Sequence, residues 1–144
     1  MCNRASDYVW FSHRQRLNQA FQPLKWFHRS GQRRLAVKRG DLVPVAVSGA
    51  YGKPHPAVII QSDYFDEHPW VKVLPITTHL RETPLFRVMV DAAPANNLRS
   101  ASQVMIDKAV TVPRDKVGEV FGSLDAAVML EIDRSLALFL GIAK

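Results

Sequence analysis

Gly52-Lys53-Pro54-His55-Pro56-Ala57-Val58-Ile59-Ile60-Gln61-Ser62-Asp63 is the stretch around which the rest of the chain can be organised. It begins as a loop that carries a lysine, a histidine and two prolines. Its apolar part, Ala57 to Ile60, predicts a buried strand over 57–62 because it is short, β-branched and bounded by Pro and Ser/Asp. Each proline favours extended geometry in the residue before it. We therefore expect Lys53 and His55 on a stiff approach to the strand, where proteins often place groups that act on a ligand.

Further short strands are predicted on both sides of this stretch. They cover residues 41–48, 71–76, 85–90, 102–106 and 109–112, with one or two helical turns at 113–120. Pro44 predicts that the first strand lies at an edge or contains a bulge. Ser123 is the expected N-cap of a C-terminal helix, and Gly141 its stop. This pattern predicts a mainly β fold with a C-terminal helix (α+β), built on a small antiparallel barrel or sandwich.

The composition is that of an ordinary globular domain. The chain has 144 residues, of which 47% are hydrophobic and 22% charged. It contains no apolar run of the ~18–20 residues that cross a bilayer, and its N-terminus lacks the apolar segment of a secretory signal. Cys2 is the single cysteine, so no internal disulfide and no cysteine-based metal spacing is possible. We expect a cytoplasmic protein that needs no metal and no cofactor.

The positive charge is concentrated at the N-terminus. Residues 1–39 hold nine Lys/Arg and one acid, whereas residues 40–144 hold ten bases and twelve acids. We therefore divide the chain into a basic, aromatic-containing extension (1–37) and a domain (38–144). The extension has the composition of a segment that binds single-stranded nucleic acid, or of a partly disordered terminus. A third hypothesis is that residues 1–36 come from an over-extended gene start and that the native product begins at Val37.

Polar residues follow or precede several of the predicted strands. They are Lys53, His55, Thr77, Thr78, His79, Asp107 and Lys108. Cleavage of RNA by its own 2′-hydroxyl needs a base, a donor or cation for the charge on the phosphate, and an acid for the leaving oxygen. Histidine, lysine and threonine can supply these functions without a metal. The structural alternatives are a solvated loop histidine, a strand-capping threonine and a turn-forming aspartate, with His79 and Arg81 as plain surface residues.

Five motifs stand in an order that resembles the PemK/MazF family of toxin endoribonucleases. They are Arg39-Gly40-Asp41-Leu42-Val43, the opening stretch, Val73-Leu74-Pro75-Ile76-Thr77, the segment 102–112 and the segment 114–124. The resemblance covers residues 38 to about 142. It implies a small SH3-like barrel with a C-terminal helix and a homodimer. It also implies metal-independent, sequence-selective cleavage of single-stranded mRNA, and an antitoxin protein as partner.

The same resemblance assigns roles to individual residues. His55 stands where the family has a catalytic arginine, Thr77 stands at the catalytic Ser/Thr, and Asp107 at an acidic strand-end position. Histidine can act as base or acid but lacks the permanent charge of arginine, which implies weaker cleavage or an altered pH profile. Lys108 and Val110 stand where some members have Gln and Arg. The residues implied in RNA binding are Lys53, Thr78, His79, Arg81 and Lys108.

Two other functions fit parts of the sequence. Gln61-Ser62-Asp63, Pro75 and Leu140-Gly141-Ile142 are similar to elements of CcdB-type gyrase poisons, which share the barrel and are not enzymes. Leu140 takes the place of the aromatic residue through which those poisons engage gyrase, which weakens this alternative. The other alternative is an inactive member of the PemK/MazF family that serves as a binding module, as His55 and Val110 suggest.

Overall fold

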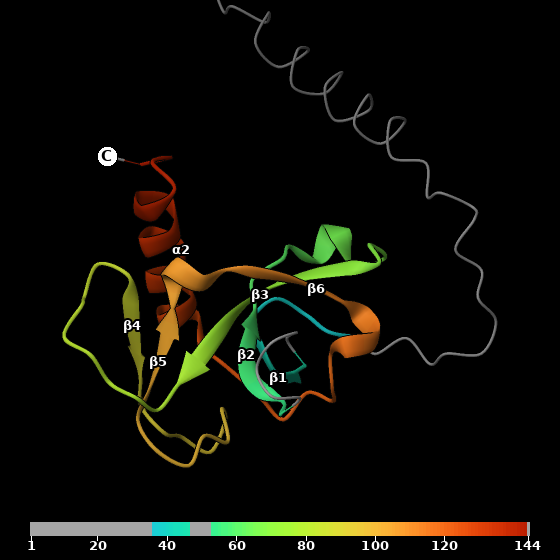
Figure 1. Ribbon diagram of the computed structural model, residues 1–144, viewed down its shortest axis with the longest axis horizontal. Coiled ribbons are helices and arrows are strands. Elements are labelled where there is room, and N and C mark those ends of the chain that lie inside the picture. Colours follow the sequence, from blue (N-terminus) through green and yellow to red (C-terminus); the bar gives the residue numbers. More distant parts are fainter. Residues whose placement is uncertain (1–35, 47–52, 144) are drawn as a thin grey trace, which may run out of the picture. The chain divides into compact units, whose positions relative to one another are not determined.

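The computed structural model describes residues 36–46 and 53–143 of the chain (Figure 1). Nearly all of the predicted extension, residues 1–35, lies outside this part, as do residues 47–52 and 144. The division into an extension and a domain therefore stays a prediction. The described residues fall almost entirely in the segment for which the sequence predicts the domain.

The described chain forms one curled antiparallel sheet and one helix (Figure 1). Its strands are β1 (Asp41–Val45), β2 (His55–Ile59), β3 (Trp70–Thr77), β4 (Arg87–Val90), β5 (Ser102–Met105), β6 (Val110–Pro113) and β7 (Gly122–Ser123). The helix α2 (Ala126–Phe139) follows, and the 3₁₀ turns are η1 (Asp63–Phe65), η2 (Ile106–Lys108) and η3 (Arg114–Lys116). The strand order is β4-β5-β3-β2-β1-β7, with β6 beside β3. The predicted mainly β fold with a C-terminal helix is confirmed.

The long strand β3 explains the curl of the sheet. Its first half, Trp70 to Val73, pairs with β6. Val73, Leu74 and Pro75 pair with β2. Its last residues, Ile76 and Thr77, pair instead with β5. A strand that changes partners along its length joins two differently oriented parts of a sheet, which makes the sheet close towards a barrel.

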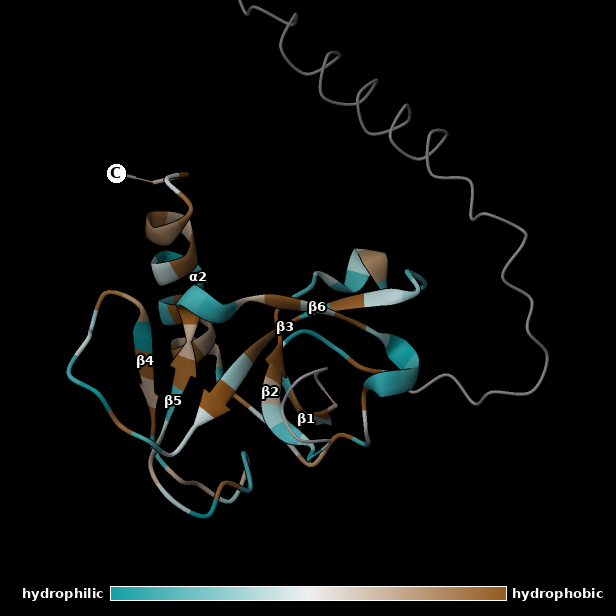
Figure 2. Cartoon of the chain, viewed as in Figure 1, coloured by the Kyte–Doolittle hydropathy of each residue, from teal (hydrophilic) through white to brown (hydrophobic). Residues whose placement is uncertain are grey.

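Two apolar clusters lie on opposite faces of β2 and β3. Ile59 and Val73 pack in the cluster enclosed by β1, β2, β3 and β6. Val58 and Leu74 pack in the second cluster, against Ile132 of α2. A strand buried on both faces has a continuous apolar sequence rather than an alternating one, which explains the run at 57–60. Figure 2 shows hydrophobic residues both along the strands and on α2.

The structure corrects several predicted boundaries. The strand predicted at 57–62 is β2, which starts at His55 because its ladder with β1 extends to the pair Val45–His55, and which ends at Ile59. The N-cap of α2 is Asp125, whose carboxylate accepts a hydrogen bond from the Val128 amide at 2.8 Å. Ser123, the predicted cap, lies in β7 instead. Gly141 follows the helix with φ +70°, as expected of a helix stop.

The first predicted strand is also shorter than expected. It ends at Val45, and its ladder with β7 covers only Asp41 and Leu42. Pro44 lies beyond the β7 ladder and faces Pro56 across the ladder with β2. The predicted edge position is wrong, because the Pro44 carbonyl oxygen accepts a hydrogen bond from the Gly118 N–H at 2.8 Å and Val45 forms an antiparallel bridge with Val117.

Candidate functional site

His55 and Thr77 lie at the same end of the sheet. β2 begins at His55 and runs antiparallel to β3, which ends at Thr77. The last pair between the two strands is Ala57–Pro75. His55 and Thr77 each lie two positions beyond this pair, and because side chains alternate along a strand they belong to the same face as that pair. The structure therefore brings these two predicted site residues to one end and one face of the sheet.

Thr77 also organises the turn that follows it. Its Oγ1 accepts a hydrogen bond from the backbone N–H of His79 at 3.1 Å. This is the strand-end cap that the structural alternative describes. A hydroxyl that accepts a hydrogen bond still has its own hydrogen to donate, so the cap leaves Thr77 able to donate to a ligand. Thr77 is half-buried, and Thr78 and His79 are exposed beside it.

Gln103 completes this end of the sheet, and the sequence did not single it out. It pairs with Thr77 across the β3–β5 ladder and is only 5% exposed. Its Oε1 accepts a hydrogen bond from the backbone N–H of Arg81 at 2.9 Å, and its Nε2 donates one to the backbone oxygen of Arg81 at 2.9 Å. In the sequence, the one sign of its role was a polar side chain, Gln103, between Ser102 and Val104 in a predicted strand. The pairing of β5 with its neighbours buries this position.

Asp107 and Lys108 lie elsewhere. They belong to η2, which follows the end of β5. Because β5 runs antiparallel to β3, this end of β5 points away from the Thr77–Gln103 pair. Within one chain, the structure thus does not bring Asp107 and Lys108 to His55 and Thr77. Whether they act on a substrate stays a prediction.

The neighbour of Asp107 is Arg87, a second residue that the sequence did not identify. The Arg87 side chain is 5% exposed, and its Nε lies 3.9 Å from Oδ1 of Asp107, whose side chain is 27% exposed. That distance allows an ion pair but no hydrogen bond. Within the described residues, the Nε of Arg87 has no hydrogen-bond partner. A buried guanidinium with an unused donor is costly, so Asp107 has a structural task as its counter-charge.

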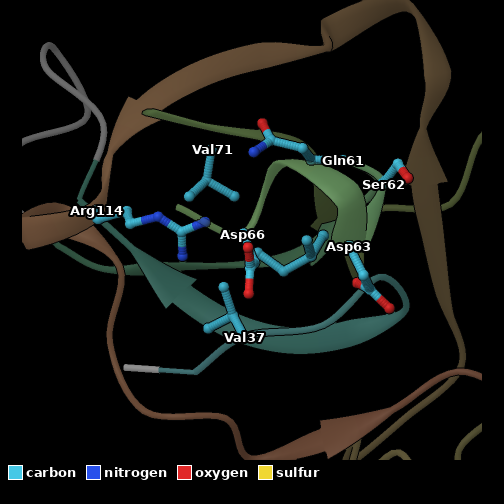
Figure 3. A pocket seen from close by; sticks show the side chains of 8 residues that line it. Val37, Gln61, Ser62, Asp63, Asp66, Val71 and Arg114 are labelled. Carbon is cyan, nitrogen blue, oxygen red and sulfur yellow. The ribbon is translucent and has the colours of Figure 1, made fainter. Parts of the chain in front are cut away.

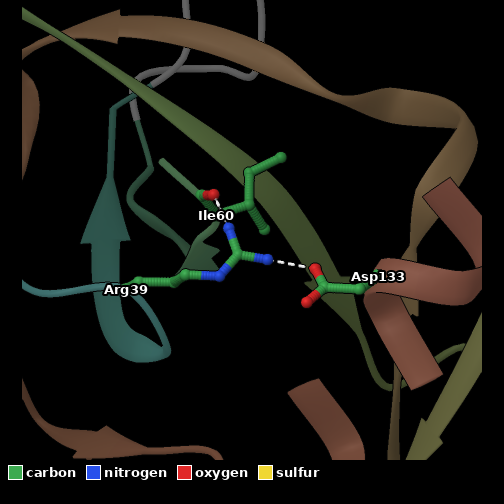
Figure 4. Close-up of polar contacts among 3 residues, drawn as sticks. All are labelled: Arg39, Ile60 and Asp133. Carbon is green, nitrogen blue, oxygen red and sulfur yellow. Dashed lines mark hydrogen bonds and ion pairs between the residues drawn. The ribbon is translucent and has the colours of Figure 1, made fainter. Parts of the chain in front are cut away.

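At the opposite end of β2, Arg39 forms contacts within the protein. Its guanidinium donates hydrogen bonds to the Ile60 carbonyl oxygen and to Asp133 of α2 (Figure 4). Its backbone N–H donates to Oδ1 of Asp63 at 2.7 Å. Next to it, Gly40 has φ +90°, a conformation that favours glycine. The Arg-Gly part of the first motif therefore ties β1 to the end of β2 and to the helix.

Two surface hollows also lie at this opposite end. One is lined by Val37, Ile59, Gln61, Ser62, Asp63, Asp66, Val71 and Arg114. Figure 3 shows Arg114 reaching over this hollow towards Asp66. A second, more open hollow is lined by Arg39, Ser62, Asp63 and Tyr64. Neither hollow contains a predicted site residue.

Lys53 is exposed, two positions before β2. In residues 36–46 and 53–143, no group of three His, Cys, Asp or Glu side chains is placed to hold a metal ion. In the same residues, no helix has the length and apolar character that crossing a bilayer requires.

The chain matches a family of known proteins. The family model described as PemK-like, MazF-like toxin of type II toxin–antitoxin system matches residues 38–140. A protein of Mycolicibacterium smegmatis named probable endoribonuclease MazF is 44% identical over 108 residues, which are 74% of this chain and 99% of that protein.

Solved structures show the same fold. The Mycobacterium tuberculosis toxin MazF-mt6 superposes with a TM-score of 0.63 at 25% identity, over 72% of this chain and 99% of that one. An endoribonuclease of a mycobacterial species, in complex with its cognate antitoxin, gives a TM-score of 0.62 at 26% identity, over 76% of this chain and 99% of that one.

Proposed function

Because this chain belongs to the family of PemK-like and MazF-like toxins of type II toxin–antitoxin systems, we propose that it is a toxin that cleaves single-stranded RNA. The observation that carries the proposal is the placement of His55 and Thr77 at one end and on one face of the sheet. An imidazole and a hydroxyl placed in this way supply a proton acceptor and a hydrogen-bond donor for transfer of a phosphoryl group.

The proposed reaction is attack by the 2′-hydroxyl on the adjacent phosphorus. The bond between O2′ and phosphorus forms, the bond between phosphorus and O5′ breaks, and a cyclic phosphate and a 5′-hydroxyl result. The imidazole of His55 takes the proton of the 2′-hydroxyl. The hydroxyl of Thr77 donates a hydrogen bond to a phosphate oxygen, and the ammonium of Lys53 supplies a proton to the leaving O5′. None of these steps needs a metal ion.

The partners and the compartment follow from the same proposal. We propose an mRNA as substrate and a cognate antitoxin protein as partner, since a relative of the same fold is an endoribonuclease in complex with its antitoxin. We further propose a homodimer that works in the cytoplasm, where mRNA is translated. Thr78, His79 and Arg81, on the loop after β3, are the proposed RNA contacts beside Thr77.

The test is cleavage of a long single-stranded RNA by the purified protein in the presence of EDTA, with the 5′ ends of the products mapped. We expect discrete cuts that disappear in the His55→Ala and Thr77→Ala variants. The matched controls are His68→Ala and Thr111→Ala, which remove the same side chains at exposed positions outside the site and should leave the cuts unchanged. Intact RNA over a wide pH range would overturn the proposal and favour a binding module without nuclease activity.

A further inference from the structure

The buried amide of Gln103 is hydrogen-bonded to one residue, Arg81, of the loop between β3 and β4. Gln103 is 5% exposed and lies between Thr77 of β3 and Met89 of β4. A buried amide is costly unless its donor and acceptor are both used. Here the acceptor takes the N–H of Arg81 and the donor reaches the carbonyl oxygen of Arg81, both at 2.9 Å, with Sδ of Met89 at 3.2 Å from the same donor. The amide is therefore hydrogen-bonded to the main chain of Arg81 on both sides of its Cα, and we call this pair of bonds the grip of Gln103 on Arg81.

These two hydrogen bonds anchor the middle of the loop between β3 and β4, whose far end is held by Phe86, which packs against the apolar cluster of Val58 and Leu74. Leu80 is 48% and Leu85 68% exposed, so these apolar side chains contribute little anchoring. The bond from the Thr83 N–H to the Arg81 oxygen is internal to the loop. In the described part of the chain, the hydrogen bonds that join the middle of this loop to the sheet are the two made by Gln103. They fix the direction in which the Arg81 side chain leaves the backbone.

The two hydrogen bonds from Gln103 determine where the main chain of Arg81 lies relative to Thr77. Gln103 is the direct cross-strand neighbour of Thr77, and Thr77 caps the start of the same loop through the N–H of His79. Arg81 is exposed, and its guanidinium forms no hydrogen bond or ion pair with another described residue. The main chain of Arg81 is thus bonded to the strand neighbour of Thr77, and the permanently charged guanidinium of Arg81 is left without a partner among the described residues. Guanidinium groups bind phosphate oxygens through two parallel hydrogen bonds.

We propose that Gln103 is a positioning residue that holds Arg81 for a backbone phosphate of single-stranded RNA next to the scissile one. The inference rests on the proposed function and assigns a task to a residue that the reaction itself does not use. Gln103 touches no substrate. It acts by keeping the Arg81 main chain in one orientation, so that little conformational entropy is lost when the guanidinium meets the phosphate.

The chain provides a matched control at the other end of the sheet. Gln61 also uses both ends of its amide on the main chain, here of two different residues: its Nε2 donates to the Phe65 oxygen at 2.9 Å, and its Oε1 accepts from the Lys72 N–H at 3.1 Å. A Gln61→Met variant therefore loses two comparable hydrogen bonds far along β2 from His55. It reports what the loss of such a grip does to stability alone.

The experiment measures binding of a fluorescently labelled, 2′-O-methylated single-stranded RNA that spans a mapped cut and cannot be cleaved. The proteins are the wild type, Gln103→Met, Arg81→Ala, the double variant and Gln61→Met. We expect Gln103→Met and Arg81→Ala each to weaken binding about tenfold and to reduce the slope of log K against log salt by about 0.7, the value of one phosphate contact on a single strand. The double variant should equal Arg81→Ala, and Gln61→Met should bind like the wild type.

Two results would overturn the inference while leaving the proposed function intact. One is additive losses in the double variant, and the other is a Gln103→Met variant that only melts at a lower temperature, with binding and salt slope unchanged. If Gln103→Met does not fold, Gln103→Glu replaces it: the carboxylate keeps the acceptor for the Arg81 N–H and loses the donor, so it should weaken binding, and unchanged binding would overturn the inference. A wild type that cuts no RNA would refute the proposed function together with this inference.

Discussion

The two ends of β2 treat their polar side chains in opposite ways. At the end after Ile59, the guanidinium of Arg39 bonds to a carbonyl oxygen and to Asp133, and the amide of Gln61 bonds to two main-chain groups. At the end before Ala57, the side chains of Lys53 and His55 form no hydrogen bond or ion pair with another described residue. The polar side chains at the Arg39 end are bonded within the protein, whereas those at the His55 end are available to a ligand.

This difference separates stabilising polar residues from those available to a ligand. A donor that is already paired within the protein contributes to folding and must lose a partner before it can bind anything else. An exposed, unpaired donor contributes little to folding and can bind at once. The comparison therefore predicts that substitutions at the Arg39 end change stability and that substitutions at the His55 end change activity.

The largest expected effect is on catalysis, at the His55 end. His55→Ala should lower kcat roughly a hundredfold or more, the usual contribution of a general base, while the melting temperature stays at the wild-type value. Steady-state cleavage and thermal melting of His55→Ala and His68→Ala check this. A large loss of stability without a loss of kcat would break the comparison.

A smaller effect is expected at the Arg87–Asp107 pair. Asp107→Asn should destabilise the protein by about 2 kcal/mol, because it leaves the buried guanidinium without its counter-charge. The double variant Arg87→Met/Asp107→Asn should recover most of that loss, since it removes the charge as well. Urea unfolding of the two variants measures both values. A double variant less stable than Asp107→Asn would show that the charge itself is needed for folding.

The same two variants show what Asp107 does. If Asp107 serves only Arg87, the double variant should cleave RNA at the wild-type rate. A loss of cleavage in a folded double variant would instead restore Asp107 as a catalytic residue.

The smallest expected effect is at the opposite end. Arg39→Met should lower the free energy of unfolding by about 1 kcal/mol, since the bonds to Ile60 and Asp133 are charge-assisted but the side chain is 30% exposed. RNA cleavage at saturating RNA should not change. Chemical unfolding and cleavage assays on Arg39→Met, with Lys72→Met as an exposed control, test this. A fall in kcat with unchanged stability would place Arg39 in the functional part of the molecule.

The sequence predicts which segments form strands better than it predicts where the strands and the helix begin and end. The apolar run at 57–60 gave the correct core strand because β2 is buried on both faces. The two-residue strand β7 carries no pattern that a sequence could reveal, and it displaced Ser123 from the helix cap that Asp125 provides. Local signals specify an element, whereas its exact ends depend on the ladder that its neighbours allow.

The candidate site shows the same limit. The sequence grouped His55, Thr77 and Asp107 as polar residues at strand ends, and the antiparallel order of the sheet separates Asp107 from the other two within one chain. Gln103 and Arg87 escaped notice because their partners, Arg81 and Asp107, come from other segments. Strand order and register decide which polar residues meet, and neither can be derived from residue types alone.

The central claim is that RNA binds at the His55 end of β2 and not at the Arg39 end. The most direct test is NMR titration of the isotope-labelled protein with the uncleavable 2′-O-methylated RNA. We expect the amide signals of His55, Thr77 to Arg81 and Gln103 to shift on binding, while those of Arg39 and Asp63 to Asp66 stay in place. Shifts confined to Arg39 and Asp63 to Asp66 would contradict this claim, because RNA would then bind at the end where the polar side chains already have partners.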